Sequence, residues 1–314
     1  MSPVTVTEPV LLMGFNRPEL MARVIDRLRE VEPRQVYVAV DGARDSHPAD
    51  GERVQACRDL VLRLDWGCEV HTLFQDANLG CGRGVSTAVT WFFDHVDRGI
   101  VLEDDIVPHP TFFDFCAELL DRYEADERVF AVSGCNVVPR TRLSRPQDSY
   151  RFSQIPVVWG WATWRRSWRH HRLDIAGWRR GLPVSRLLKR VGYSPTSALF
   201  WGSEFELTAR GDVDTWDWQL TQAAMASGQL TATSNVNLVE NIGFGSDATH
   251  TVGGAARLAP PTPVVLPTEP VPVVVDLMAD QWATRHHFGG SMLTSLDRVR
   301  KYARSDRKPV APWR

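Results

Sequence analysis

Residues 100–105, with the sequence IVLEDD, join three apolar residues to three consecutive carboxylates. The apolar run predicts a buried strand, and the acids Glu103, Asp104 and Asp105 follow at its carboxyl end. Three adjacent negative charges repel one another unless a cation or hydrogen-bond donors compensate them. A hard divalent metal is a natural compensator, and it would in turn hold a diphosphate. A solvated acidic turn or a helix N-cap is the alternative that this segment alone leaves open.

The first 135 residues alternate between strand-like and helix-like hydrophobic patterns. Strands are predicted at residues 10–14, 35–40, 68–74, 99–102 and 129–133, with helices at 17–28, 52–64, 85–96 and 111–123. Strands separated by helices of this length are typical of βαβ units and a parallel sheet. Ligands of such sheets bind outside the carboxyl ends of the strands. The acids that follow residue 102 therefore lie where a site is expected.

Polar residues and glycines follow the other strands of this predicted sheet. Asn16 and Arg17 follow the first strand, Asp41 follows the second, and residues 78–84 (NLGCGRG) follow the third and open a helix. An aspartate there can accept a hydrogen bond from a base or ribose, while glycines and a helix N-terminus favour phosphate. The spacing G-x-G-x-G after the third strand does not fit a dinucleotide fingerprint, and no P-loop sequence occurs.

Composition and charge narrow the class of protein. The chain has 314 residues, with 36 Lys and Arg against 38 Asp and Glu, for a net charge of −2. This is a soluble globular composition, and the near-zero charge argues against nucleic acid as the main partner. Without a basic leader or an apolar run near the roughly 18 residues of a membrane span, we expect a cytoplasmic protein. The tail from Arg298, with seven Lys and Arg and one acid, predicts either peripheral contact with an anionic membrane or a solvated terminus.

A series of segments, in order along residues 9–255, carries a family resemblance. They are Asn16-Arg17-Pro18, Val40-Asp41-Gly42, Asn78-Leu79-Gly80-Cys81, Leu102-Glu103-Asp104-Asp105, Val132-Ser133-Gly134, Trp159-Gly160-Trp161, Thr215-Trp216-Asp217-Trp218-Gln219 and Asn241-Ile242-Gly243. Together they resemble the GT-A glycosyltransferases, the nucleotide-diphospho-sugar transferase fold. More narrowly, they look like bacterial relatives of N-acetylglucosaminyltransferase I.

The resemblance implies an α/β fold with a Rossmann-like, mostly parallel sheet flanked by helices. Residues 1–254 would form the GT-A domain, with 1–135 as the nucleotide-binding half and 136–254 as the sugar and acceptor half. Composition, and not the resemblance, predicts an extension over residues 255–314. Its Pro- and Val-rich part, residues 255–275, would be an extended segment packed along the body, and residues 291–304 would form a basic helix before the tail.

The resemblance also implies roles at the site. Arg17 and Asp41 would hold the nucleotide base, and Glu103 would lie beside the ribose. Asp104 would position the ribose or sugar, while Asp105 would bind Mn²⁺ or Mg²⁺ through the diphosphate. The remaining donor-binding candidates are Asn16, Asn78, Gly80, Arg83 and Trp161.

The candidates for the catalytic base lie further along the chain. Asp217 aligns near the general base of inverting relatives, although the family has two adjacent acids where this chain has Asp217-Trp218. Asp214, three residues earlier, is the second candidate, and helix capping is the alternative role for Asp217. His250 is a candidate metal or phosphate contact, with an ordinary hydrogen-bonded histidine as the alternative.

Tryptophan is concentrated in one part of the sequence. Eight of the 12 Trp lie between Trp159 and Trp218. Trp161, Trp164 and Trp168 have the spacing of one helix face, whereas Trp159 and Trp161 alternate as in a strand. We expect most of them in the core, with one or two lining a sugar site, because aromatic rings stack on sugars.

These observations predict a metal-dependent glycosyltransferase. It would move a sugar from a nucleoside diphosphate, UDP by resemblance, to an acceptor hydroxyl with inversion. The acceptor would be a carbohydrate, a lipid-linked molecule or a small molecule. The alternatives are a sugar nucleotidyltransferase of the same fold and a non-catalytic nucleotide-sugar binding protein.

Overall fold

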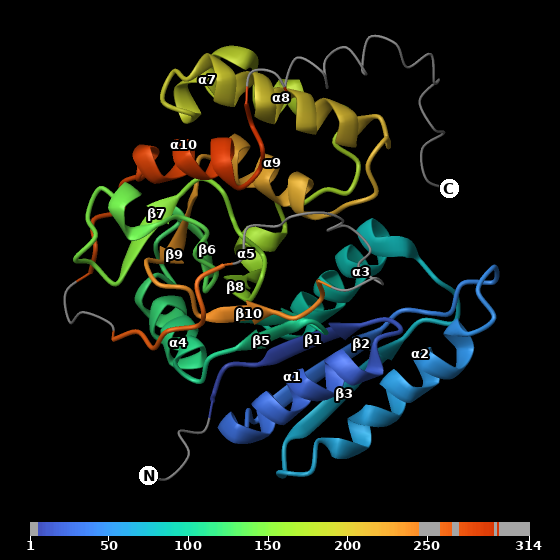
Figure 1. The fold of residues 1–314 in the computed structure, drawn as a ribbon. Helices are drawn as coiled ribbons and strands as arrows, with labels where there is room; N and C mark the ends of the chain where they lie inside the picture. The colour runs from blue at the N-terminus through green and yellow to red at the C-terminus, as the bar shows by residue number, and fades with distance from the viewer. Residues whose placement is uncertain (1–5, 245–257, 266–269, 292–293, 295–314) are drawn as a thin grey trace.

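The computed structural model describes residues 6–244, 258–265, 270–291 and 294 (Figure 1). The predicted alternating strands and helices form one half of a larger sheet. The sheet has eight strands in the order β3-β2-β1-β4-β8-β6-β9-β7, and a separate two-stranded sheet pairs β10 with β5. The mixed, helix-flanked sheet confirms the predicted α/β class.

The parallel half of the sheet contains β3 (Glu69–Phe74), β2 (Gln35–Val40), β1 (Val10–Gly14) and β4 (Arg98–Glu103). Its connections are α1 (Pro18–Val31), α2 (Asp50–Asp59) with the short 3₁₀ helix η1 (Leu60–Arg63), and α3 (Gly80–His95). α1 buries Met21, Val24, Ile25 and Leu28, the i, i+3, i+4, i+7 spacing of one helix face. In β1 and β2 the predicted and observed bounds agree, while α3 begins five residues before the predicted position 85.

The other half of the sheet is mixed. β8 (Trp161–Trp164) runs antiparallel to both β4 and β6 (Val129–Ser133), and β9 (Leu230–Ser234) lies parallel to β6. β7 (Tyr150–Ser153) closes the edge, antiparallel to β9. β5 (Ile106–Pro108) and β10 (Val239–Asn241) pair beside the acidic segment. This pairing holds residues 241–243 against Asp105, whose carbonyl accepts a hydrogen bond from the Ile242 amide at 2.8 Å.

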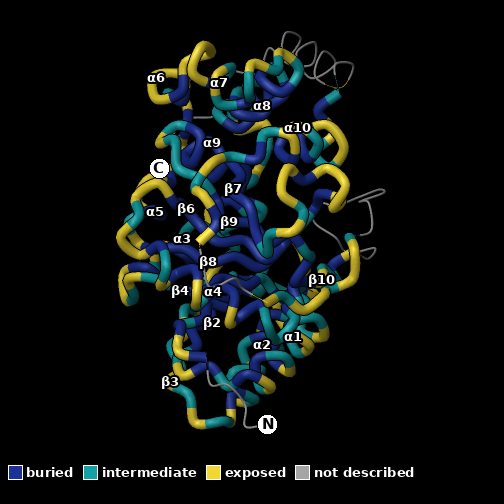
Figure 2. Tube along the Cα trace, turned by 90° about the vertical axis from the view of Figure 1, so that its left-hand side faces the viewer, coloured by how far each residue is buried: buried dark blue, intermediate teal, exposed yellow. Residues whose placement is uncertain are grey.

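Side chains alternate between two hydrophobic cores, one on each face of the sheet. α1, α2, and α4 (Thr111–Arg122) cover the face that includes Leu12 and Val38. α3 and α9 (Asp217–Ser227) cover the face that includes Leu11 and Val101. Figure 2 shows most of the strands as the buried centre of the molecule, while the edge strand β3 is partly exposed.

A third core holds the helices at the far end of the molecule from α1 and α2 (Figures 1 and 2). The helices around it are α6 (Trp178–Gly181), α7 (Val184–Arg190), α8 (Pro195–Ala209) and the end of α9. α10 (Leu277–His286) packs against α8, whereas α5 (Arg165–Trp168) places Trp168 in the core under α3. Trp178, Phe200, Trp201 and Phe205 are buried here. No helix among the described residues is both long and apolar enough to cross a membrane.

The expected helix face of Trp161, Trp164 and Trp168 is wrong. Trp161 and Trp164 end strand β8, and only Trp168 lies in a helix, the four-residue α5. The alternation of Trp159 with Trp161 was therefore the correct indicator. All three side chains are buried, and so are Trp178, Trp201 and Trp216, which confirms the expectation that most of the eight Trp belong to the core.

The C-terminal part of the chain is described only in pieces. Val271 donates from its backbone amide to the Tyr150 hydroxyl at 3.0 Å, and Asp276 donates to the Phe152 carbonyl at 2.8 Å. These contacts place residues 271–276 along β7. The η2 turn (Arg140–Arg142) contacts α10. The predicted terminal helix at 291–304 and the basic tail lie almost entirely outside the described residues.

Candidate active site

A cavity of about 420 Å³ opens at the carboxyl ends of β1, β2 and β4, where the parallel topology predicts a site. Its walls combine an apolar side, a group of carboxylates and the start of α3. The lining residues are Met13, Gly14, Phe15, Arg17, Ala39, Val40, Asp41, Arg44, Leu73, Gln75, Asn78, Gly80, Cys81, Gly84, Val85, Ala88, Glu103, Asp104, Asp105, Trp159, Asp214, Asn241 and Gly243.

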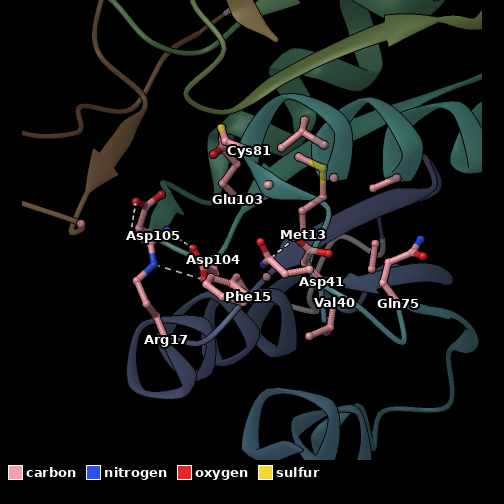
Figure 3. Close-up of a pocket in the computed structure, with 18 of the residues that line it drawn as sticks. Met13, Phe15, Arg17, Val40, Asp41, Gln75, Cys81, Glu103, Asp104 and Asp105 are labelled. Carbon is pink, nitrogen blue, oxygen red and sulfur yellow. Dashed lines mark hydrogen bonds and ion pairs between the residues drawn. The ribbon is translucent and has the colours of Figure 1, made fainter. Parts of the chain in front are cut away.

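Two of the three consecutive acids, Asp104 and Asp105, pair with one cation, Arg17 (Figure 3). Glu103 ends β4, and Asp104 and Asp105 form the turn before β5. Arg17, at the start of α1, forms ion pairs with both aspartates, including a contact from Nη1 to Asp105 Oδ2 at 2.9 Å. Burial opposes the charge of Arg17, but Asp104 and Asp105 outweigh it and raise the guanidinium pKa. Arg17 therefore pairs with Asp104 and Asp105 but not with Glu103.

Glu103 is the acid without a partner. Among the described residues, no hydrogen bond or ion pair reaches its carboxylate, although it lines the cavity. Burial raises its pKa well above the ordinary value, and the charges of Asp105 and Asp104 raise it further. A cavity-facing acid that the protein leaves unsatisfied is a candidate for contact with a ligand.

Asp104 is the most buried member of the group, with 2% of its surface exposed. Burial raises its pKa to about 6, although the charge and hydrogen bonds of Arg17 oppose this shift. The Arg17–Asp104 pair fixes the start of α1 against the end of β4. Its burial makes Asp104 a positioning residue for Arg17 and Asp105.

Asp41 is held by the loop that precedes α3. Its carboxylate accepts hydrogen bonds from the backbone amides of Gly42 at 2.9 Å and Leu79 at 3.0 Å, and from Asn78 Nδ2 at 3.0 Å. Burial nevertheless raises its pKa, because these donors only partly offset the lost hydration. Asp41 and Asn78 thus form one fixed wall of the cavity, where both were predicted.

The N-terminus of α3 faces Asp214 from the opposite half of the chain. Gly80 has a left-handed φ of 77°, and a Cβ there would lie 3.1 Å from Asp214 Oδ2. The Gly82 amide donates to Asp214 Oδ1 at 3.0 Å. An acid at a helix N-terminus is favoured by the helix dipole. The glycines of residues 80–84 therefore allow this close approach.

Asp217 is the first residue of α9, and its Oδ1 accepts hydrogen bonds from the Thr215 hydroxyl and from the Trp218 amide. It does not line the cavity, but its charge reaches two groups that do. It contributes to the raised pKa of Glu103, and burial, then Glu103, Asp214 and Asp217, raise the pKa of Cys81 to about 12. Acids from both halves of the chain thus gather around the Cys81 thiol.

Besides Asp217, three candidates lie away from the cavity. The Asn16 side chain donates to Asp50 Oδ1 at 2.8 Å instead. Arg83 is exposed and does not line it. Trp161 is only 1% exposed and packs against Trp168 and Trp216, so the structure contradicts a sugar-stacking role. His250 lies outside the described residues.

Several lining residues were not singled out from the sequence. Trp159, two residues before Trp161, lines the cavity and meets Phe244 edge-on at 5.9 Å. Its spacing from Trp161 did not reveal this position, because strand residues two apart face the same side, and Trp159 lies just before β8. The sequence pattern did not predict that the cavity would be lined by Arg44, Gln75 and Cys81, because their positions depend on how separate loops pack together.

The carboxylate oxygens of the cavity could bind a divalent cation if a substrate supplied the remaining ligands. Among the described residues, no group of three His, Cys, Asp or Glu side chains is arranged to hold a metal ion. Mg²⁺ in phosphate-handling sites commonly uses one or two carboxylates, with phosphates and waters completing its shell. Asp105 and the unpartnered Glu103 are such oxygen donors, and both line the cavity.

Comparisons with known proteins add little beyond the fold. No known family profile matches the sequence. No curated protein matches it either.

Solved structures match parts of the chain. HddC from Yersinia pseudotuberculosis has 11% identity and a TM-score of 0.32, covering 51% of this chain and 78% of its own. The inositol-1-phosphate CTP transferase from T. maritima has 8% identity and a TM-score of 0.36, covering 73% and 85%. A structure described as a glucose-1-phosphate thymidylyltransferase from Bacillus anthracis, in complex with a sucrose, has 11% identity and a TM-score of 0.31, covering 52% and 74%. These similarities are too low to indicate an activity, and the Rossmann-like α/β fold follows from the observed sheet.

Proposed function

We propose that this protein is a metal-dependent glycosyltransferase of the GT-A type. It moves a sugar from a nucleoside diphosphate, UDP by the family resemblance, to an acceptor hydroxyl with inversion. The observation that carries the proposal is the cavity at the end of β4. There the acids Glu103 and Asp105 face Asp214 from the other half of the chain.

The parts of the cavity suit the parts of a nucleotide sugar. The apolar side, with Val40 and Leu73, suits the flat face of a base next to Asp41. Glu103 can accept a hydrogen bond from a ribose hydroxyl, and Asp105 supplies the metal ligand near the diphosphate. A bound divalent cation would stabilise the negative charge of the departing diphosphate.

The acceptor side needs a base that takes the proton from the attacking hydroxyl. Asp214 lines the cavity, and Asp217 lies at the start of α9, close enough to act on the pKa of Glu103. Asp217 keeps the role that the family resemblance gives it. Asp214 is the second candidate because it is exposed at the cavity.

A sugar nucleotidyltransferase is the second candidate function. The solved structures that match part of this chain include a CTP transferase and one described as a thymidylyltransferase. Such an enzyme binds a nucleoside triphosphate, whose negative charge is stabilised by cationic side chains in the binding site. The two cationic side chains that line the cavity, Arg17 and Arg44, are both paired with aspartates of this chain. This pairing favours the glycosyltransferase.

One reaction series separates the candidates. A thermal-shift screen of nucleotide sugars with Mn²⁺ identifies a donor, because a bound ligand raises stability by mass action. The products formed from that donor are then followed by phosphorus NMR. Release of a nucleoside diphosphate supports the glycosyltransferase. Formation of a nucleotide sugar and pyrophosphate from a nucleoside triphosphate and a sugar phosphate supports the nucleotidyltransferase. Binding without turnover identifies a non-catalytic binding protein.

A further inference from the structure

The segment between β8 and α8 is the most basic part of the described chain. Residues 165–190 hold nine Lys and Arg and one acid, which gives 9 − 1 = +8. The whole chain has a net charge of −2, so the remainder carries −10. No Asp or Glu occurs from residue 175 to residue 203. The positive charge is therefore local and is not balanced along the sequence.

Five of these nine cations lie on α6 and α7, and all but Arg190, which donates to the Met225 carbonyl, are exposed. Arg180, Arg186 and Lys189 are exposed, and none of them has an acidic partner among the described residues. We call these three residues, with Arg179, the basic face. Arg179 is also exposed, and it pairs with Glu206 of α8 at 2.9 Å. Leu187 anchors α7 on its inner side with 1% of its surface exposed.

Two large apolar side chains flank the basic face. Val184, the first residue of α7, is 52% exposed, and Tyr193, after its end, is 70% exposed. Tyr193 also has a left-handed φ of 58°, which is uncommon for an aromatic residue. Exposed apolar groups next to unpaired cations are typical of proteins that lie on a bilayer, where the cations meet headgroups and the apolar groups enter the interface.

The position of the basic face suits a flat partner. α6 and α7 lie at the end of the molecule opposite α1, α2 and β3, in both views (Figures 1 and 2). The segment that leads to them packs beside the candidate site. The His171 ring nitrogen Nε2 lies 3.3 Å from the Trp216 carbonyl, and Leu173 lies 3.4 Å from the Cβ position of Gly82.

We propose that the basic face docks on an anionic lipid bilayer. The partner is identified by charge complementarity and by the apolar flanks, and the proposal does not depend on the proposed function. Nucleic acid fits less well, because Val184 and Tyr193 gain nothing from phosphates and the remainder of the chain carries a charge of −10. The contact made by α6 and α7 is separate from any contact of the tail after Arg298.

The test is co-sedimentation of the full chain with vesicles. We expect binding to vesicles of phosphatidylcholine and phosphatidylglycerol in equal parts, no binding to phosphatidylcholine alone, and loss of binding as salt rises. Each cation near such a surface contributes about a 5-fold gain in partitioning. The variant Arg180→Gln/Arg186→Gln/Lys189→Gln should therefore bind about 100-fold more weakly.

Controls separate this contact from others. The variant Arg23→Gln/Arg34→Gln/Arg140→Gln has the same change in charge at other exposed positions and should bind like the unmodified chain. Tyr193→Asn, which suits the left-handed φ, should weaken binding by several fold without a loss of thermal stability.

Two outcomes overturn the proposal. One is unchanged vesicle binding by the basic-face variant while neutralising the seven tail cations abolishes binding. The other is binding of the unmodified chain to duplex DNA but not to anionic vesicles.

Discussion

Two groups of buried acids in this protein have opposite surroundings. On α10, Asp276 and Asp280 have hydrogen-bond donors at both oxygens. Asp276 accepts from the Ser144 amide and hydroxyl and from the Ala279 amide, and Asp280 accepts from the Ser153 hydroxyl and the Gln154 amide. At the end of β4, Asp104 and Asp105 share Arg17, and Glu103 has no partner among the described residues.

The difference in hydrogen-bond partners distinguishes acids that stabilise the fold from acids that can bind a ligand. A buried acid whose oxygens are all satisfied fixes one chain segment to another, as Asp276 and Asp280 fix α10 to β7. A group of buried acids with too few hydrogen-bond donors or cations lowers the stability of the fold. Such a group is typical of a binding site, where a ligand supplies the missing positive charge or donors. We therefore expect changes at the β4 acids to affect turnover, and changes on α10 to affect stability.

The largest effect on turnover is expected at Asp217, the first residue of α9. Asp217→Asn removes a carboxylate that can take a proton, so turnover should fall by about 10²–10⁴-fold while donor affinity is kept. Steady-state kinetics and calorimetry measure the two quantities. Asp276→Asn, at the start of α10, is the matched control and should leave turnover unchanged in the folded protein.

The same measurement tests the second candidate base. If Asp217→Asn keeps its turnover and Asp214→Asn loses it, the base is Asp214. If both variants keep full turnover, the proposed inverting mechanism is wrong at this step.

The second effect concerns the metal ligand. Asp105→Asn should lower metal-dependent turnover by at least about 100-fold, because a neutral amide is a poor ligand for a hard cation. The free energy of unfolding should stay equal or rise, since repulsion among the three acids is relieved. Metal titrations and thermal melts check this pair of results. Turnover equal to that of the unmodified chain would remove Asp105 from the site.

The third effect is a pH dependence of stability on α10. Burial raises the pKa of Asp280 to about 6, although its hydrogen bonds oppose the shift. The folded protein therefore binds this proton more tightly than the unfolded chain, and the free energy of unfolding falls as pH rises from about 4 to 6. Relative to Asp280→Asn, the unmodified chain should lose about 2 kcal/mol over this window. Urea unfolding at several pH values measures this, and parallel pH profiles would contradict it.

The smallest effect on donor binding is expected at Gly243, which follows β10 and packs against Asp105. A Cβ on Gly243 would lie 2.1 Å from Asp105 Oδ2, so Gly243→Ala must displace that carboxylate. We expect roughly 10-fold weaker metal-dependent donor binding, comparable to the loss of one supporting contact around a metal ligand. Gly51→Ala is the control, because nothing lies within 4 Å of its Cβ position and Ala favours the helix α2. Equal donor affinity in both variants would contradict the expected displacement.

The sequence predicted one half of the fold better than the other. β1, β2 and the acids after β4 follow from regular alternation, because each buried parallel strand is a short apolar run ended by polar residues. The strands β7 to β10 are three to five residues long and pair with distant segments, so their local pattern carries little signal. The Trp-rich segment shows this limit, since its spacing fitted a helix while the sheet made it a strand.

The site was predictable to a similar extent. Asp41, Asn78 and the three acids were found because strand ends of a parallel sheet meet at one edge. The Arg17–Asp105 pair and the approach of Gly243 depend on how loops cross, which spacing alone does not determine. Asn16 was misplaced for the same reason, because Asp50, in the first turn of α2, binds its side chain.

The most direct test of the account is turnover of a nucleotide-sugar donor with and without a divalent cation. With Mn²⁺, we predict transfer or hydrolysis that releases a nucleoside diphosphate. Turnover should be lost in EDTA and restored by excess Mn²⁺, because the β4 acids need a cation to hold the diphosphate. A full rate of turnover in EDTA would contradict the role assigned to these acids.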